Sequence, residues 1–242
     1  MAKEGKNYLR GLVESIVCTP NIFRISMEDG KYIFSISSND QQTNDWYAVS
    51  AIYDSICEVD KQIKYAFGQA ISFNIPETLE GYNPFSKFSE EENIALYHTE
   101  NIVYRVSILW DLLAQLCNVL YHTNLRVEQI NYNRYFEKYS KGKNAIEIVK
   151  EIKSYLNETD DFEVDTNPWK GNHAFLNSYR NQMTHRVSPS VSSISTLGII
   201  LRPPTMYVLH RATEDYYVVS SFLCKLINIF LEESKDWLPL GG

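Results

Sequence analysis

Apolar residues recur at three- and four-residue steps through most of this chain of 242 residues, which is the spacing of amphipathic helices. Ser89 followed by three glutamates indicates a helix start, with Glu92 closing a capping box. The helix that begins there has apolar residues on several sides, so we expect it to be the central helix of a bundle. The pattern predicts helices over residues 44–73, 89–122, 132–139, 143–156, 173–186 and 213–237.

Residues 1–40 are interpreted as strands instead, because residues 12–18 alternate apolar and polar positions, as half-buried strands do. Asp29-Gly30 lies between two β-rich runs and is a hairpin signal. We expect a two- or three-stranded meander that is too small to be stable by itself and packs on the helical body. Its strands are expected at residues 12–18, 21–27 and 31–37.

A second β element is predicted late in the chain, where residues 197–201 and 206–210 flank Arg202-Pro203-Pro204-Thr205. The expected fold is therefore mainly α. It consists of an antiparallel helical bundle over residues 41–242, a small β-meander over residues 1–40, and a short β-hairpin before the last helix.

Composition is that of an ordinary globular protein, with 44% apolar and 22% charged residues. The N-terminus lacks the apolar core of a signal peptide, and no run reaches about 18 consecutive apolar residues. We therefore expect a cytoplasmic protein without a membrane partner.

The four cysteines are far apart and contain no C-x-x-C pair, which favours reduced thiols. No Cys/His spacing suits zinc, so we expect neither a metal nor a cofactor.

The net charge of −7 argues against indiscriminate nucleic-acid binding, but the charge is unevenly distributed. No acidic residue occurs between Asp165 and Glu214. This basic window favours a local anion site. The alternative is that its cations neutralise acidic helices elsewhere in the fold. The window contains Lys170, Arg180, Arg186, Arg202 and Arg211, together with His173, His185 and His210.

The candidate chemistry lies in the stretch Trp169–Val187, where Arg180, Asn181 and His185 form an R-N-x-x-x-H pattern near a helix end. A cation, a polar group and an imidazole are the parts needed to hold and cleave a phosphodiester. Asn181 and His185 share a helix face, so the amide can fix the imidazole tautomer. Arg180 and His185 lie about 140° apart around a straight helix. They meet either in a cleft reached from both faces or across a two-fold dimer axis.

This motif, with the order of the helices, resembles the HEPN superfamily of helical domains associated with nucleotide binding and RNA cleavage. The resemblance covers about residues 44–237. It implies a metal-independent endoribonuclease that works as a homodimer, in which the ribose 2′-hydroxyl attacks the adjacent phosphate. His185 would act as general base or acid, Arg180 would stabilise charge on the phosphorane-like oxygens, and Asn181 would orient His185 or the phosphate.

Further substrate contacts are expected from Lys170, His173, Tyr179 and Arg186, which surround the motif. The expected partners are a second copy of the chain, RNA and an antitoxin-like protein, as in a toxin or defence factor. Two other functions use the same residues differently. One is a catalytically silent HEPN dimer that binds a nucleotide, RNA or a protein, and the other is a structural module in which Arg180 and His185 are incidental.

Two other sets of residues have alternative interpretations. The aromatic cluster at residues 132–139 suits either base stacking or a core, and at this spacing a core is more common. Glu100, Arg105 and Asp111 are charges inside an apolar helix, so each should be paired, face a cleft or lie on the surface.

Overall fold

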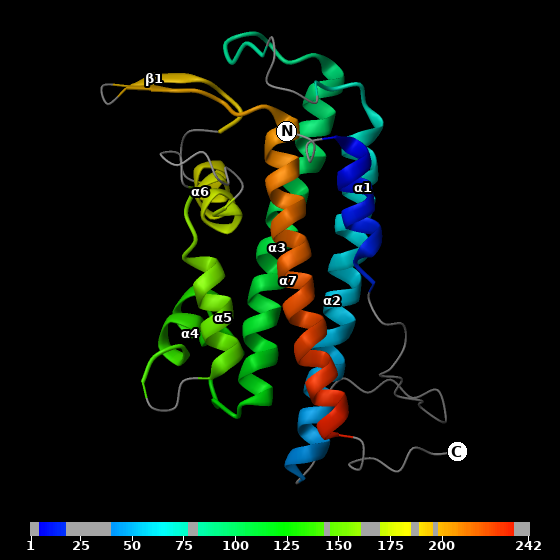
Figure 1. Cartoon of the computed structure of the whole chain (residues 1–242), viewed down its shortest axis with the longest axis vertical. Helices are drawn as coiled ribbons and strands as arrows, with labels where there is room; N and C mark the ends of the chain where they lie inside the picture. Colours follow the sequence, from blue (N-terminus) through cyan, green and yellow to red (C-terminus); the bar gives the residue numbers. More distant parts are fainter. Residues whose placement is uncertain are drawn as a thin grey trace.

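The computed structural model describes residues 5–17, 40–76, 82–142, 146–160, 170–184, 189–195 and 198–234. Within these segments the chain is mainly helical (Figure 1). A 3-10 turn, Val127–Gln129, and two short strands complete the described elements. The α-helices are α1 (Lys6–Ser15), α2 (Gln41–Ser72), α3 (Glu90–Leu120), α4 (Tyr132–Tyr139), α5 (Glu147–Leu156), α6 (Asn172–Thr184) and α7 (Thr205–Glu233).

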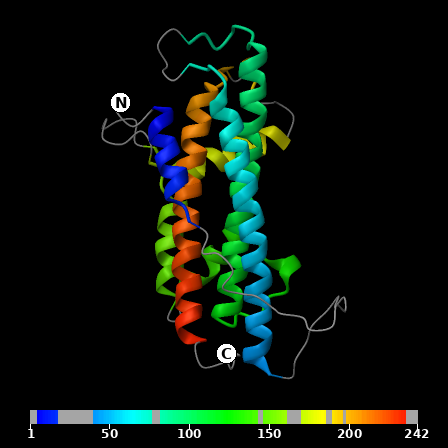
Figure 2. The same cartoon turned by 90° about the vertical axis from the view of Figure 1, so that its right-hand side faces the viewer.

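Three long helices, α2, α3 and α7, lie side by side and form the body of the molecule (Figures 1 and 2). Helix α2 runs antiparallel to α3, whereas α7 runs in the same direction as α3. Helix α1 packs along α7 and buries Leu9 and Val13 in the common core. Lys6 Nζ donates to the backbone oxygen of Phe73 at the end of α2, at 2.8 Å. The structure is thus mainly α and bundle-like, but the predicted antiparallel arrangement is wrong for α3 and α7, which run in the same direction.

The start of α3 follows from its local sequence. Ser89 Oγ accepts from the backbone N–H of Glu92, and the Glu92 carboxylate accepts from the N–H of Ser89, so the predicted capping box is confirmed. Three acidic residues in the first turn stabilise the positive end of the helix dipole. The apolar residues beyond them face several neighbours, and α3 contacts α2, α4, α6 and α7. The sequence thus correctly identifies α3 as the central helix.

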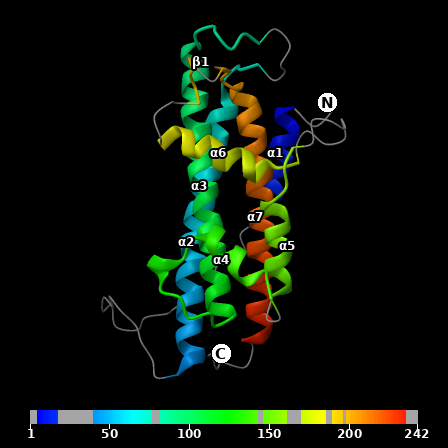
Figure 3. The same ribbon diagram turned by 90° about the vertical axis from the view of Figure 1, so that its left-hand side faces the viewer.

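Because α3 and α7 run in the same direction, the chain must travel back along the bundle between them. Helices α4, α5 and α6 belong to this return segment, which we define as residues 121–204, and they lie on one side of the bundle (Figure 3). Helix α6 lies across the long helices rather than along them (Figure 3). This crossing position sets which of its side chains face α3 and α7.

The predicted N-terminal β-meander is wrong where the structure describes it. Residues 12–15, expected at the start of a strand, belong to the helix α1. Leu9 and Val13 are four positions apart and both buried, so burial follows the helical period and overrides the alternation. The predicted strands at 21–27 and 31–37 lie outside the described residues.

The predicted late β-hairpin is also wrong. Residues 206–210, expected as its second strand, form the first turns of α7. Pro204 is the N-cap of α7, and its φ of −61° suits the entry to a helix. Part of the predicted first strand is extended, but it pairs with an earlier segment: β1 (Ser193–Ser195) is antiparallel to β2 (Gly198–Ile200).

The described cysteines lie in or beside the helical core as free thiols. Cys117 is fully buried, and this burial raises the pKa of its thiol. Cys57 and Cys224 are partly buried. Cys18 lies outside the described residues.

Candidate functional site

The motif helix α6 begins at a position that requires glycine. Gly171 has a φ of +86°, in the left-handed region. A Cβ at this position would lie 2.8 Å from backbone atoms of Thr159 and Asp160. The close approach brings the start of α6 against the segment that follows α5, and so fixes where the motif helix crosses the bundle.

We expect Gly171→Ala to reduce the free energy of unfolding by about 1–2 kcal/mol from the backbone conformation alone, with a further cost from the contact at Thr159 and Asp160. Gly68→Ala provides a matched control. Gly68 lies inside α2 with no heavy atom near the added methyl group, so this change should stabilise by about 0.5–1 kcal/mol. Urea denaturation followed by circular dichroism measures both. Equal effects of the two substitutions would contradict the proposed strain.

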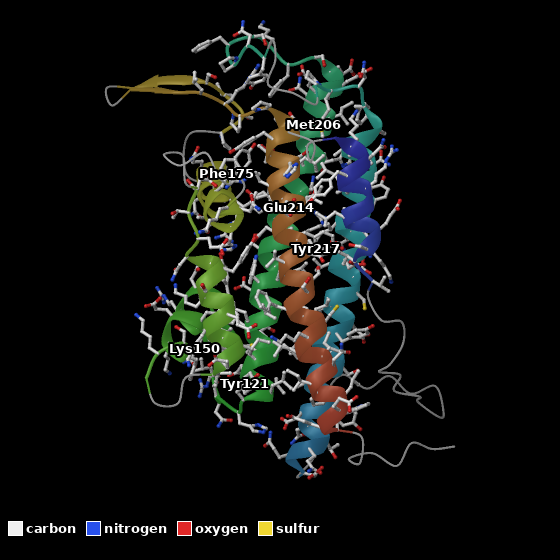
Figure 4. All side chains as sticks on the ribbon, in the orientation of Figure 1. Tyr121, Lys150, Phe175, Met206, Glu214 and Tyr217 are labelled. Carbon is white, nitrogen blue, oxygen red and sulfur yellow. The ribbon has the colours of Figure 1, made fainter. Side chains whose placement is uncertain are left out.

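Arg211 anchors α7 to the segment beside Gly171. Its Nη1 and Nη2 atoms donate to the two carboxylate oxygens of Asp160, at 3.0 and 2.8 Å. The guanidinium also lies over the ring of Phe175 on α6, 4.8 Å from its centroid (Phe175 is labelled in Figure 4). Arg211 is fully buried, so this cation of the basic window serves the fold.

Arg202 and His210 are likewise used within the protein. Arg202 donates to the Tyr82 hydroxyl at 3.3 Å and to the backbone oxygen of Ser86, and its guanidinium lies over the Phe88 ring. His210 Nε2 lies 3.4 Å from a carboxylate oxygen of Glu214. Arg202 therefore contacts uncharged groups and His210 a carboxylate of its own helix, so through these contacts the two do not neutralise acidic helices elsewhere in the fold.

A buried polar network joins the motif helix to the rest of the molecule. Asp215 on α7 accepts hydrogen bonds from Trp110 Nε1 on α3 at 3.0 Å and from the Tyr155 hydroxyl on α5 at 2.8 Å. His173 Nδ1 on α6 lies 3.3 Å from the same carboxylate. The Tyr132 hydroxyl on α4 is hydrogen-bonded to His173 Nε2 at 3.1 Å. Five helices thus contribute one side chain each to this network. His173, expected to contact a substrate, is instead buried within it.

The aromatic rings of this network are closely packed. Trp110 stacks on Tyr155 with centroids 5.8 Å apart, and the His173 ring meets Trp110 edge-on at 5.1 Å. Burial raises the pKa of Tyr132 to about 12, although the charge of Arg180 lowers it in part. The Tyr132 hydroxyl therefore stays protonated at neutral pH. The aromatic cluster at residues 132–139 buries Tyr132, Tyr135 and Phe136 in the core, the commoner of the two alternatives.

Arg180 lies at the inner edge of α6, facing α3 and α4. Its Nη2 donates to Asn177 Oδ1 at 3.2 Å. Burial raises the pKa of Asp111 on α3, and a hydrogen bond from the Tyr132 backbone and the nearby charge of Arg180 partly offset this. The cavity beside Arg180 has a volume of only 10 Å³, about enough for one water molecule. It is therefore not a substrate pocket, and any RNA must approach Arg180 from the solvent side.

Tyr179 is buried rather than available to a substrate. Its hydroxyl donates to Glu100 Oε1 on α3 at 3.5 Å. Burial raises the pKa of Glu100, and the Tyr179 hydrogen bond lowers it in part. Burial and the charge of Glu100 in turn raise the pKa of Tyr179. The expected pairing of a charge within α3 is thus found for Glu100.

The outer face of α6 is exposed at its C-terminal end. Asn181 is exposed and lies about 100° around the helix from Arg180, so the structure does not bring these two side chains together. Thr184 Oγ1 donates to the backbone oxygen of Asn181 at 3.0 Å. Lys170 is exposed at the other end of α6. His185 and Arg186 lie outside the described residues, so their roles stay predictions.

Sequence reasoning missed the network centred on Asp215. One signal was present: Asp215 lies four residues after Arg211, between the apolar positions Ala212 and Val219 of the same face. Because the last helix was predicted to begin at residue 213, Arg211 and Ala212 were left outside it, and this face was not recognised. Among the described residues, no group of three or more His, Cys, Asp or Glu side chains is placed to hold a metal ion.

The chain matches no protein-family model, and comparison with curated proteins and with solved structures finds no similar protein. The resemblance to the HEPN superfamily therefore rests on the motif and the order of the helices alone, and stays a prediction. Of the described helices, α3 is long and apolar enough to cross a membrane, with a mean hydropathy of 1.3 over its best window. That window is 56% buried in the bundle, as in the core helix of a globular protein, so this is weak evidence for a span.

Proposed function

We propose that this protein is a metal-independent endoribonuclease of the HEPN type, acting as a homodimer with Arg180 and His185 in its site. The 2′-hydroxyl of a ribose loses its proton to a histidine and attacks the adjacent phosphorus. The P–O5′ bond breaks, and the leaving oxygen takes a proton from a second histidine. The products carry a 2′,3′-cyclic phosphate and a 5′-hydroxyl. His185 and its copy in the partner subunit share the two proton transfers, and Arg180 stabilises the phosphorane-like oxygens.

The exposure of Arg180 and the neutral partner of its guanidinium are the main support for this proposal. Among the described arginines of the basic window, Arg202 and Arg211 are buried in internal contacts, whereas Arg180 is partly exposed and its guanidinium donates to the neutral side chain of Asn177. The adjacent Asn181 is exposed and precedes His185 by four positions in the sequence. A cation and an amide are thus accessible at the end of α6 where the motif continues.

A catalytically silent dimer that binds RNA, a nucleotide or a protein is the alternative. It is favoured by the nearby carboxylate of Asp111, on which the charge of Arg180 acts, and by the net charge of −7. A guanidinium partly neutralised within its own chain contributes less to stabilising a phosphorane. The two functions share their residues and differ in whether RNA is cut.

The proposed chemistry requires a 2′-hydroxyl, so we expect cleavage of single-stranded RNA and of neither DNA nor 2′-O-methyl RNA of the same sequence. The rate should be unchanged by EDTA, and end analysis should find 2′,3′-cyclic phosphate. DNA cleavage, or complete loss of activity with EDTA, would exclude this mechanism. RNA that binds without being cut would favour the silent dimer. Expression of the active protein should slow cell growth, and His185→Ala should relieve this effect.

A further inference from the structure

A groove between α2 and α3 has features that the proposed nuclease site does not use. These two helices lie side by side along one face of the bundle (Figure 2). The groove has a volume of 260 Å³, far larger than the cavity beside Arg180. Lysine, arginine and aromatic side chains line it, among them Lys61, Tyr65, Tyr97, His98 and Arg105.

Three aromatic rings line this groove. The side chains of Tyr65 and Tyr97 are unusually open for tyrosines, with exposed fractions of 67% and 64%. His98 lies between them, and its ring meets Tyr97 edge-on at 5.3 Å and Tyr65 at 6.5 Å. Partial burial lowers the pKa of His98, so at neutral pH its ring is uncharged. The groove therefore offers flat apolar faces to solvent.

A guanidinium is held at the same groove by neutral groups. Arg105 Nε donates to Gln62 Oε1 at 2.9 Å, and its Nη1 donates to the side-chain and backbone oxygens of Asn101 at 2.9 and 3.2 Å. The Gln62 amide donates in turn to Glu58 at 3.0 Å, which orients its oxygen toward Arg105. In this chain of hydrogen bonds Gln62 lies between Arg105 and the Glu58 carboxylate, so Arg105 is linked to that carboxylate only through Gln62. Lys61 adds a second, exposed cation.

We propose that this groove binds a nucleotide, with the base stacked on Tyr97 or Tyr65 and the phosphate at Arg105 and Lys61. Aromatic faces beside fixed cations are the usual means of binding an unpaired nucleotide. The volume is near the lower end of ligand sites, about 300 Å³, which suits one nucleotide rather than a larger cofactor. The groove belongs to α2 and α3 and contains no residue of the motif helix, so it stands independently of the proposed cleavage site.

A free mononucleotide and one nucleotide of single-stranded RNA share this chemistry. Isothermal titration calorimetry with AMP tests the first source. Fluorescence anisotropy with a labelled 2′-O-methyl octanucleotide tests the second, because this probe lacks the attacking hydroxyl and cannot be cleaved. Binding of a probe that the groove variants weaken supports the groove and identifies its source, whereas binding that only Arg180→Ala weakens belongs to the motif helix. Adenosine and inorganic phosphate, tested separately, should each bind more weakly than AMP, because each occupies half of the site.

The variants Tyr97→Ala and Lys61→Ala remove exposed side chains and should leave the helices intact, which circular dichroism checks. Loss of stacking should weaken binding at least about fivefold, and loss of the cation should weaken it and reduce its salt dependence. Tyr217→Ala and Lys150→Ala on α7 and α5 are matched controls on exposed residues outside the groove (both labelled in Figure 4). They should bind as the wild type does.

The proposal would be overturned if neither probe binds at concentrations up to about 1 mM, or if all four variants bind with equal affinity. It would also be overturned if an acidic tyrosine-containing peptide, a different class of ligand, binds more tightly than AMP. Arg180→Ala keeps this test separate from the nuclease. That variant should lose cleavage while retaining affinity for the probe. A cleaving enzyme whose groove variants bind normally would refute the groove and leave the proposed function standing.

Discussion

Replacing His185 with alanine is expected to slow RNA cleavage by about 10²–10⁴-fold, because in the proposed mechanism its ring transfers a proton. Arg180→Ala should have an effect of similar size, since the proposed mechanism uses this cation to stabilise charge developing on the phosphate oxygens. The measurement is the single-turnover rate constant with labelled single-stranded RNA at saturating enzyme. This isolates the chemical step from substrate binding.

The control for these variants is Arg134→Ala on α4, which removes an exposed arginine and should leave the rate within about twofold. Rates equal to that of the wild type in both His185→Ala and Arg180→Ala would show that the activity comes from a contaminating nuclease. A loss in Arg180→Ala without any loss in His185→Ala would remove the histidine from the mechanism.

The largest expected loss of stability is for Asp215→Ala, which should reduce the free energy of unfolding by about 3 kcal/mol or more. The carboxylate accepts hydrogen bonds from Trp110 and Tyr155 and faces His173, all in the interior. Removing it leaves these donors buried without their acceptor. Since each donor comes from a different helix, the change should also loosen the docking of α5 and α6 on the bundle.

Guanidinium denaturation followed by circular dichroism measures this loss, and the exposed Asp54→Ala on α2 is the matched control, with an expected change within about 0.5 kcal/mol. Asp215→Asn keeps the shape and one acceptor, so its cost should be intermediate. A change below about 1 kcal/mol in Asp215→Ala would mean that water or a shifted side chain replaces the carboxylate. The network would then contribute little to holding α6 in place.

The predicted elements succeeded where the signal is local. The capping box at Ser89 and Glu92 depends on residues three positions apart, and α4 is found at the predicted residues 132–139. Residues 206–210 were misassigned because Met206, Tyr207 and Val208 suit a strand locally. In the structure Leu209, Ala212 and Tyr216 are buried on one face of α7, so these residues are helical. This apolar face can be recognised in the sequence only if the helix is taken to begin after Pro204.

The candidate site was predicted only in part, for a different reason. The R-N-x-x-x-H pattern is sequential, so Arg180 and Asn181 could be singled out, but the direction in which each faces depends on how α6 crosses α3. The partners of Asp215 are residues 110, 155 and 173, and residue 132 joins the network through His173. No spacing rule relates these positions, because the fold alone brings them together. The groove at Arg105 is hidden in the same way, since half of it belongs to α2.

The parallel course of α3 and α7 has a consequence for how this protein can diversify. The long helices and α1 share one apolar core, and the helices of the return segment, α4, α5 and α6, also bury side chains in it. Changes in the length of the return segment are therefore tolerated only between these helices, where the buried side chains keep their places. The exposed end of α6 can vary in sequence more freely than the buried positions that hold it, among them His173 beside Asp215.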